Sequence, residues 1–397
     1  MRGEKAVSTI AIICEYNPFH NGHKFQIESQ KKLLNAGGVI AIMSGNFVQR
    51  GAPAICDKWH RAKMALLSGA DLVLELPTVF ATQSAERFAK GAVGLSDGLG
   101  VVDYLSFGCE CDNIESLNRA ACIIEKTETK EKITELLKEG MSYPSARMIA
   151  CGDEFFSVLS KPNNILAIEY IKALKELKST IRPVPLLREG CEHDADKPYG
   201  DFASAGYIRK CITEGRDYSG FVPDECVKIL KEADIFKDKK KLDAVITYLL
   251  RTKSPDELSS VADMTEGIQY RFKEAGSRFS TIEEIADFVK TKRYTKTRID
   301  RLIINILLSI KKDDITKNPG YIRVLGFNEH GEKILSQIKK KSVFPIITKT
   351  ADASLPEEAM KMLEKDIYAT DIYSMLCMEK ENGKSGLDYI KSPIIIK

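Results

Sequence analysis

Metal-ligating clusters and long apolar runs are scarce in this sequence of 397 residues. It contains 5 histidines and 10 cysteines, and no two cysteines stand in a Cys-x-x-Cys pair, so a structural zinc site of the usual spacing is not expected. No apolar run approaches the ~18 residues that cross a bilayer. The net charge of +3 neither requires nor excludes a nucleic-acid partner. We therefore expect a cytoplasmic protein with reduced thiols, no structural metal and no membrane partner.

The composition is that of a folded globular chain, with 44% hydrophobic and 29% charged residues. Its length predicts two or three domains. Over residues 1–214, short apolar runs alternate with segments of helical periodicity, which is typical of an α/β fold with a parallel sheet and helices on both faces. Strands are expected at Thr9 to Cys14, Val39 to Met43, Leu72 to Leu76, Tyr104 to Phe107 and Thr180 to Leu187.

Beyond residue 214 the apolar pattern becomes mostly helical. Tyr321 to Lys349 is the exception, with two strand-like runs around a helix. The sequence therefore predicts a Rossmann-like α/β domain over residues 1–214 and a mainly helical domain over residues 215–397. Helices of this second domain are expected at Val222 to Leu230, Leu242 to Arg251, Pro255 to Ala275, Ile282 to Val289 and Thr297 to Ile310.

The segment after the first expected strand carries the clearest chemical signal. A proline-containing loop there leads into His20-Asn21-Gly22-His23 at the start of a helix. Glycine lets a phosphate approach the backbone, and the free N–H groups of a helix start favour an anion. Two imidazoles three residues apart can donate hydrogen bonds to phosphate oxygens. A surface turn with solvated histidines is the alternative, but the position after the first strand favours nucleotide binding.

His20-Asn21-Gly22-His23 matches the signature of the nucleotidyltransferase superfamily, whose core is similar to that of class I aminoacyl-tRNA synthetases. Further motifs follow in order over most of the chain, and together they resemble the bacterial tRNA(Met) cytidine acetate ligases. These motifs are Ser44-Gly45-Asn46-Phe47-Val48-Gln49-Arg50-Gly51, Asp57-Lys58 with Arg61-Ala62, Phe107-Gly108-x-Glu110, Lys161-Pro162-Asn163-Asn164-Ile165-Leu166, Thr291-Lys292-Arg293-Tyr294-Thr295 and Arg323-Val324-Leu325-Gly326-Phe327.

The resemblance implies an ATP-dependent ligase that works in two steps. Acetate would attack the α-phosphate of ATP to give acetyl-adenylate and pyrophosphate. N4 of the wobble cytidine, nucleotide 34 of elongator tRNA(Met), would then take the acetyl group to form N4-acetylcytidine, with release of AMP. Acetyl-coenzyme A would not be needed and no protein partner is implied. Mg²⁺ is expected with ATP because the triphosphate charge needs neutralising.

The same resemblance implies the site residues. His20 and His23 would be catalytic. The superfamily's second signature is typically Ile-Ser-Ser-Thr-x-x-Arg, and residues 203–209 of this chain correspond to it. Ser204 and Arg209 are expected to contact phosphate. Gly206 stands where a hydroxyl residue is usual. ATP is expected to contact Ile13, Cys14, Glu15, Tyr16, Asn17, Pro18, Phe19, His20, Asn21, Gly22, His23, Lys24, Phe25, Gln26, Gly108, Asn164, Arg188 and Glu189.

Basic side chains form a second set of candidates. Arg50 follows the second expected strand, where its guanidinium suits the acetate carboxylate or a tRNA phosphate. Residues 290–301 hold six basic side chains, one acid and Tyr294, which favours RNA phosphates and base stacking over a solvated helix end. The candidates for substrate or tRNA contact are Arg50, Lys58, Lys292, Arg293, Lys296 and Arg298.

Other interpretations stay open at this point. Asp57 is expected to cap a helix, and capping alone would account for one of Asn163 and Asn164. A small-molecule adenylyltransferase of cofactor biosynthesis shares the His-x-Gly-His core but is generally one compact domain, so residues 215–397 count against it. A tRNA-binding protein with a merely regulatory nucleotide site would not need both His20 and His23.

Overall fold

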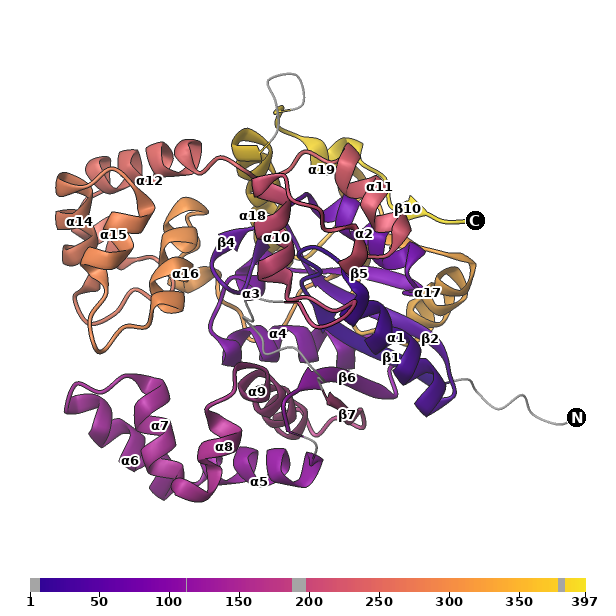
Figure 1. Ribbon diagram of the computed structural model, residues 1–397, viewed down its shortest axis with the longest axis horizontal. Coiled ribbons are helices and arrows are strands. Elements are labelled where there is room, and N and C mark those ends of the chain that lie inside the picture. Colours follow the sequence, from indigo (N-terminus) through magenta and orange to yellow (C-terminus); the bar gives the residue numbers. More distant parts are fainter. Residues whose placement is uncertain (1–7, 112, 188–197, 378–382) are drawn as a thin grey trace, which may run out of the picture.

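The computed structural model describes residues 8–111, 113–187, 198–377 and 383–397. Its centre is an 8-stranded sheet in the order β10-β8-β5-β2-β1-β6-β7, with β9 paired to β8 (Figure 1). From β5 to β7 all neighbouring strands are parallel, so the predicted α/β fold is confirmed. The strands are β1 (Ser8–Cys14), β2 (Ala36–Ser44), β5 (Leu72–Leu76), β6 (Tyr104–Cys109), β7 (Arg182–Leu187), β8 (Ile322–Phe327), β9 (Ile346–Ile347) and β10 (Ile394–Ile395).

Helices cover both faces of the sheet because the central strands are apolar on both sides. In β1, Ile10 and Ile12 pack into one core, whereas Ala11 packs into the other. The first core is closed by α1 (Asn21–Leu34), α2 (Lys58–Leu67), α10 (Ala205–Glu214) and α11 (Asp224–Glu232). The second is closed by α4 (Ala85–Gly98), α5 (Ile114–Glu125) and α9 (Pro162–Glu176).

The strand order reverses at β1. The chain runs from β1 to β2 and β5 on one side, and then crosses to β6 on the other side. Loops that leave the carboxyl ends of β1 and β6 therefore diverge, and a crevice opens between them. The His-x-Gly-His segment follows β1 and Gly108 lies near the end of β6, so both candidates stand at this crevice.

Two groups of helices extend from the sheet (Figure 1). One group follows β6 and precedes β7 along the chain. It consists of α5 to α9, with α6 (Thr127–Lys138), α7 (Tyr143–Cys151) and α8 (Phe156–Leu159). The other consists of α12 (Lys240–Thr252), α13 (Pro255–Ser259), α14 (Ile268–Arg278), α15 (Ile282–Val289) and α16 (Lys296–Leu307). The prediction of one helix from Pro255 to Ala275 is wrong, because Asp263, Glu266 and Gly267 take positive φ angles and separate α13 from α14.

The end of the chain returns to the sheet. β8 pairs antiparallel with β5, and β10 pairs with β8. The helices of this part are α17 (Glu329–Lys341), α18 (Glu357–Cys377) and α19 (Leu387–Ile390). The division at residue 214 therefore does not separate the sheet from the rest of the chain. Periodicity predicted two strand-like runs around a helix within Tyr321 to Lys349, but it does not say which sheet a strand joins.

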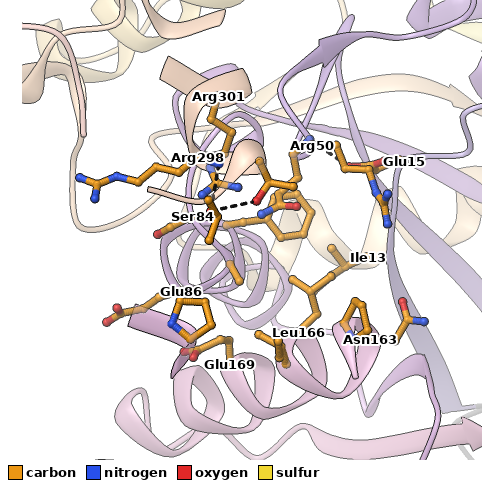
Figure 2. A pocket seen from close by; sticks show the side chains of 18 of the residues that line it. Ile13, Glu15, Arg50, Ser84, Glu86, Asn163, Leu166, Glu169, Arg298 and Arg301 are labelled. Carbon is orange, nitrogen blue, oxygen red and sulfur yellow. Dashed lines mark hydrogen bonds between the residues drawn. The ribbon is translucent and has the colours of Figure 1, made fainter. Parts of the chain in front are cut away.

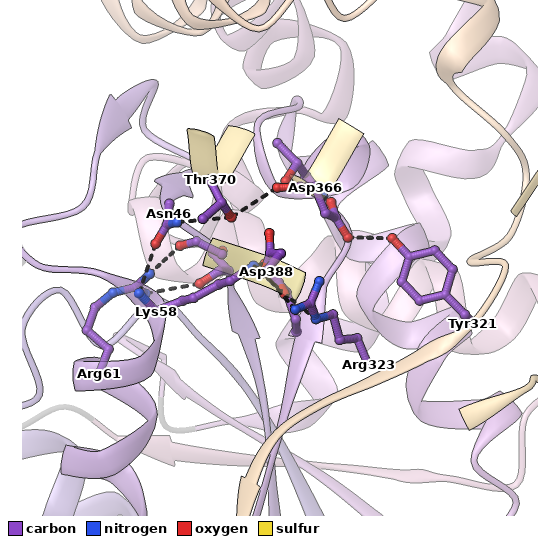
Figure 3. Close-up of polar contacts among 12 residues, drawn as sticks. Asn46, Lys58, Arg61, Tyr321, Arg323, Asp366, Thr370 and Asp388 are labelled. Atoms are coloured by element: carbon purple, nitrogen blue, oxygen red, sulfur yellow. Dashed lines mark hydrogen bonds and ion pairs between the residues drawn. The ribbon is translucent and has the colours of Figure 1, made fainter. Parts of the chain in front are cut away.

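A buried ionic cluster fastens this returning part to the sheet (Figure 3). The Nζ of Lys58 donates to both carboxylate oxygens of Glu75 at 2.8 and 2.9 Å and lies 2.9 Å from Oδ1 of Asp388. Arg323 contacts the same two acids, with Nη2 2.6 Å from Oδ1 of Asp388. All four side chains are buried. The cluster thus joins α2, β5, β8 and α19.

Candidate active site

The two histidines are held face to face at the start of α1. His20 is the N-cap residue, in extended backbone conformation, and His23 lies in the first turn. Their rings stack with centroids 3.6 Å apart, and the backbone N–H of His20 donates to Nδ1 of His23 at 3.3 Å. Tyr16 packs edge-on against His23. A Cβ at Gly22 would lie 3.0 Å from the His20 ring, so glycine there makes room for the imidazole.

A buried arginine organises the strand ends beneath these histidines. Arg61 is fully buried, and its guanidinium donates to the carbonyl oxygens of Glu15, Ser44, Gly45 and Cys56. The carbonyls of Glu15, Ser44 and Gly45 lie at the ends of β1 and β2, which would otherwise end with unpaired acceptors. Arg61 therefore fixes the path of the loop that leads to His20.

The turn from residue 49 to residue 51 joins β3 (Phe47–Val48) to β4 (Ala52–Pro53) and closes one side of the crevice. The N–H of Gln49 donates to the Glu15 carboxylate at 2.9 Å. Burial raises the pKa of Glu15, while the nearby Arg50 guanidinium opposes that rise. Gly51 has φ of 79°, and a Cβ there would lie 2.4 Å from the backbone nitrogen of Arg301. Glycine is thus required at position 51 for two reasons: the positive φ angle of the turn and the close backbone contact with α16.

A cavity of about 770 Å³ lies beside these elements (Figure 2). Its size is in the range of ligand-binding pockets. Of the candidates within the described residues, it is lined by Ile13, Cys14, Glu15, Tyr16, Asn17, His20, His23, Gln26, Arg50, Gly108, Arg209, Arg293 and Arg298. Candidates that do not line it are Pro18, Phe19, Asn21, Gly22, Lys24, Phe25, Lys58, Asn164, Ser204, Lys292 and Lys296. Arg188 and Glu189 lie outside the described residues.

The second signature lies at the start of α10, against the first. Ser204 caps α10 by accepting the N–H of Tyr207 at 3.1 Å. Arg209 donates to the backbone carbonyl of Asn17 at 2.7 Å, which holds its guanidinium next to the His20 loop. A Cβ at Gly206 would meet neighbouring atoms only at ordinary contact distance, so packing alone does not require glycine at this position.

The basic segment approaches the cavity from α16 and the loop before it. Arg293 pairs with Glu266 at 3.0 Å and donates to the carbonyl of Leu137, so it links the two helical groups. Arg298 pairs with Asp263 at 3.3 Å. Tyr294 is buried, and its hydroxyl donates to Glu266. It therefore does not present a ring face for the base stacking that the sequence predicted.

Two further candidates are buried away from the cavity lining. Lys58 is fully buried in the cluster of Figure 3 and therefore cannot contact a substrate or tRNA. Asn164 is buried beside the turn after β6, where its Oδ1 accepts the N–H groups of Glu110 and Cys111 at 2.9 and 3.1 Å. Neither asparagine caps α9, whose N-cap residue is Lys161. Asp57 caps α2 as predicted.

Several cavity residues were not among the candidate site residues. Asn163 and Leu166 belong to the motif at residues 161–166, and Glu169 follows at the same three-residue spacing on α9. Arg147 lies on α7, and no motif covers it. Within the described residues no helix could span a membrane, the cysteines are free thiols, and no group of three or more His, Cys, Asp or Glu could hold a metal ion.

Comparison with known proteins supports this assignment of motifs. The family model of the HIGH Nucleotidyl Transferase family matches residues 7–387. A tRNA(Met) cytidine acetate ligase of Caldanaerobacter subterraneus subsp. tengcongensis is 44% identical over 406 residues, which cover 98% of this chain and 100% of the relative. One of Clostridium perfringens is 40% identical over 406 residues, covering 97% of this chain and 99% of the relative.

Solved structures agree with the sequence comparison. The apo structure of Thermotoga maritima TmcAL matches with a TM-score of 0.90 at 34% identity, covering 98% of this chain and 99% of that chain. The structure of the same protein bound with alpha-thio ATP matches with a TM-score of 0.88 at 33% identity over the same shares. The chain therefore belongs to the HIGH nucleotidyl transferase family and, within it, to the family of the tRNA(Met) cytidine acetate ligases.

Proposed function

We propose that this chain uses ATP to activate acetate as acetyl-adenylate and then transfers the acetyl group to N4 of the wobble cytidine, nucleotide 34 of elongator tRNA(Met). Its relatives are named for this tRNA, base and carboxylate, and one binds alpha-thio ATP. The observation that carries the proposal is that one cavity is lined both by the stacked His20 and His23 and by Arg293 and Arg298 of the basic segment. Because the substrate is a tRNA, we also propose that the reaction takes place in the cytoplasm.

The first step needs charge stabilisation at phosphorus. An acetate oxygen forms a bond to the α-phosphorus of ATP while the bond from that phosphorus to the leaving pyrophosphate breaks. His20 and His23, at the start of α1, would donate to the phosphate oxygens as their charge develops, and Arg209 adds a fixed positive charge beside the same loop. Arg50 lies beside Glu15 on the cavity wall and is the candidate to hold the acetate carboxylate.

Mg²⁺ fits this site as part of the substrate. Mg²⁺ usually keeps several waters and binds through substrate phosphates with one or two carboxylates. The cavity offers single carboxylates such as Glu15, and the described residues hold no cluster of three or more ligating side chains. Mg²⁺ would therefore arrive with ATP and neutralise part of the triphosphate charge.

The second step transfers the acetyl group within the same cavity. N4 of the cytidine forms a bond to the acetyl carbon, the bond from that carbon to the adenylate oxygen breaks, and N4 loses a proton as AMP leaves. The mixed anhydride reacts readily with water, so it has to stay enclosed until the base arrives. The Arg293–Leu137 contact links the two helical groups at the cavity, because both residues line it.

The test uses the purified chain with ATP, labelled acetate and tRNA(Met), and scores label on the tRNA. We expect label from acetate without acetyl-coenzyme A, and pyrophosphate release that requires acetate. Exogenous acetyl-adenylate should support transfer without ATP. Propionate should react slowly, because one extra methylene costs only about 1–3 kcal/mol of discrimination. Acetate-independent pyrophosphate release with a phosphorylated small molecule would favour the adenylyltransferase alternative.

A further inference from the structure

Two buried charged side chains in the cavity wall make fewer contacts than their burial requires. Arg147 of α7 is 3% exposed and Glu169 of α9 is 4% exposed, and both line the cavity. Nη1 of Arg147 lies 3.8 Å from Oε1 of Glu169, which is too far for a hydrogen bond. Within the described residues, no hydrogen-bond partner reaches Nε of Arg147. Oε2 of Glu169 is occupied by Lys172 at 2.9 Å, so Oε1 is the oxygen that remains for a further donor.

A desolvated guanidinium with an unused donor destabilises the fold unless something pairs with it. The surroundings of the pair are partly apolar. Tyr143 and Pro144 lie next to Arg147 on α7, and Leu166 lies one turn before Glu169 on α9, so apolar surface borders the two charges. A ligand that fits here presents an amino group to Glu169 and a neighbouring acceptor to Arg147.

Among the substrates of the proposed function, two molecules have this pattern. Cytosine presents the N4 amino group beside the N3 and O2 acceptors, and adenine presents the N6 amino group beside a ring nitrogen. Uracil does not fit, because its O4 acceptor would face the carboxylate and its N3–H would face the guanidinium. The pair is therefore able to distinguish cytosine from uracil.

The position of the pair favours the RNA base over adenine. α7 follows α6, whose Leu137 carbonyl accepts a hydrogen bond from Arg293 of the basic segment. Figure 2 shows Glu169 and Leu166 along α9 on one side of the pocket, with Arg298 and Arg301 on the opposite side. The wall that carries the pair is thus linked to the basic segment by the Leu137–Arg293 contact, and Arg298 and Arg301 of that segment face it across the pocket, whereas His20 and His23 follow the end of β1.

We propose that Arg147 and Glu169 read the cytosine that is to be acetylated, with Glu169 accepting from N4 and Arg147 donating to N3 or O2. This inference rests on the proposed function. It assigns the base-specificity residues of the second step, and it places N4 at the carboxylate, where the amino group is oriented before transfer.

The test compares binding of two tRNA(Met) transcripts that carry cytidine or uridine at nucleotide 34, in the presence of AMP. The wild-type chain should bind the cytidine transcript about tenfold more tightly, within the range of one good base contact. Glu169→Gln should bring this ratio close to one, because an amide can donate to uracil as well as accept from cytosine. Glu86→Gln is the matched control. Glu86 lines the same cavity but is half exposed and pairs with Lys90, so the ratio should stay as in the wild type.

The ratio separates base reading from a structural role, since a misfolded variant would lose affinity for both transcripts. If the wild-type chain binds the cytidine and uridine transcripts equally tightly, the inference is overturned without any variant. The inference is also overturned if Glu169→Gln keeps the wild-type ratio of the two affinities. If Glu169→Gln instead raises the KM for ATP in acetate-dependent pyrophosphate release while the ratio is kept, the pair reads adenine and the assignment is wrong. Failure of the wild type to acetylate tRNA would count against the proposed function alone, because the binding ratio requires no chemistry.

Discussion

Replacing Lys58 by methionine tests whether this side chain supports the fold or contacts a substrate. Its ammonium lies fully buried, 2.8 Å from Glu75 and 2.9 Å from Asp388. Together with Arg323, the two positive and two negative charges of the cluster cancel. Lys58→Met leaves one buried negative charge in excess. Breaking a buried ion pair by removing one partner costs about 3–5 kcal/mol, and we expect a loss of that size in the free energy of unfolding.

The assay can be made local, because the chain has a single tryptophan beside the cluster. Trp59 is buried, and its ring centroid lies 5.1 Å from Nζ of Lys58. Urea unfolding followed by tryptophan fluorescence reports on this junction, and far-ultraviolet circular dichroism reports on the whole chain. Lys361→Met is the matched control. It removes an exposed ion pair with Glu357, and the unfolding midpoint should stay unchanged.

A double variant checks that charge balance is the cause. Lys58→Met combined with Asp388→Asn leaves Glu75 and Arg323 as a neutral pair, so the combined loss of stability should be smaller than the sum of the single losses. The reasoning would be refuted if Lys58→Met kept wild-type stability and weakened tRNA binding. That result would show that Lys58 contacts a substrate, as the sequence predicted.

Three further predictions concern the catalytic step, the RNA surface and the pH dependence. His23→Ala should slow acetyl-adenylate formation by about 10²-fold or more, with a far smaller change in ATP affinity; near-normal pyrophosphate release would remove His23 from the mechanism. Changing Lys292, Arg293 and Lys296 to alanine should abolish transfer to tRNA but not adenylate formation, and binding should become less sensitive to salt; unchanged tRNA affinity would make the segment a solvated surface. Burial raises the pKa of Asp366 to about 7, so the folded state keeps a proton that the unfolded chain releases near its usual pKa of about 4. Stability should fall between those pH values as pH rises, and Asp366→Asn should flatten this slope in urea titrations; an unchanged slope would show that another group titrates.

Local signals predicted the position of the two histidines well. The strand predicted at Thr9 to Cys14 and the helix that follows His20 are encoded by neighbouring residues, so the sequence placed both histidines correctly at the crevice. The polar partners could not be predicted in the same way. Lys58 is buried because Asp388, near the far end of the chain, folds back onto it, and no pattern around residue 58 announces that contact.

Contacts between segments far apart in the sequence also explain the other differences between the predictions and the structure. Tyr294 was expected to stack on a base, but Glu266, in an irregular segment between two helices, binds its hydroxyl and holds it inside. Arg147 and Glu169 lie on different helices and share no motif, so only the assembled fold, in which α7 and α9 both contact α5, places them together. A single helix is encoded by local periodicity, whereas the pairing of buried charges depends on the assembled fold.

The antiparallel pairing of β8 with β5 has a consequence for synthesis of the chain. A ribosome completes β5 long before it reaches residue 322, so the edge of a strand as apolar as Leu72–Leu76 stays open on the nascent protein. Open apolar edges recruit other strands and promote aggregation. The part of the chain before β8, which carries His20 and His23, therefore cannot finish folding as an independent unit. Its folding waits for the last segments to emerge, and a chain that stops short of β8 is a natural target for chaperones and proteases.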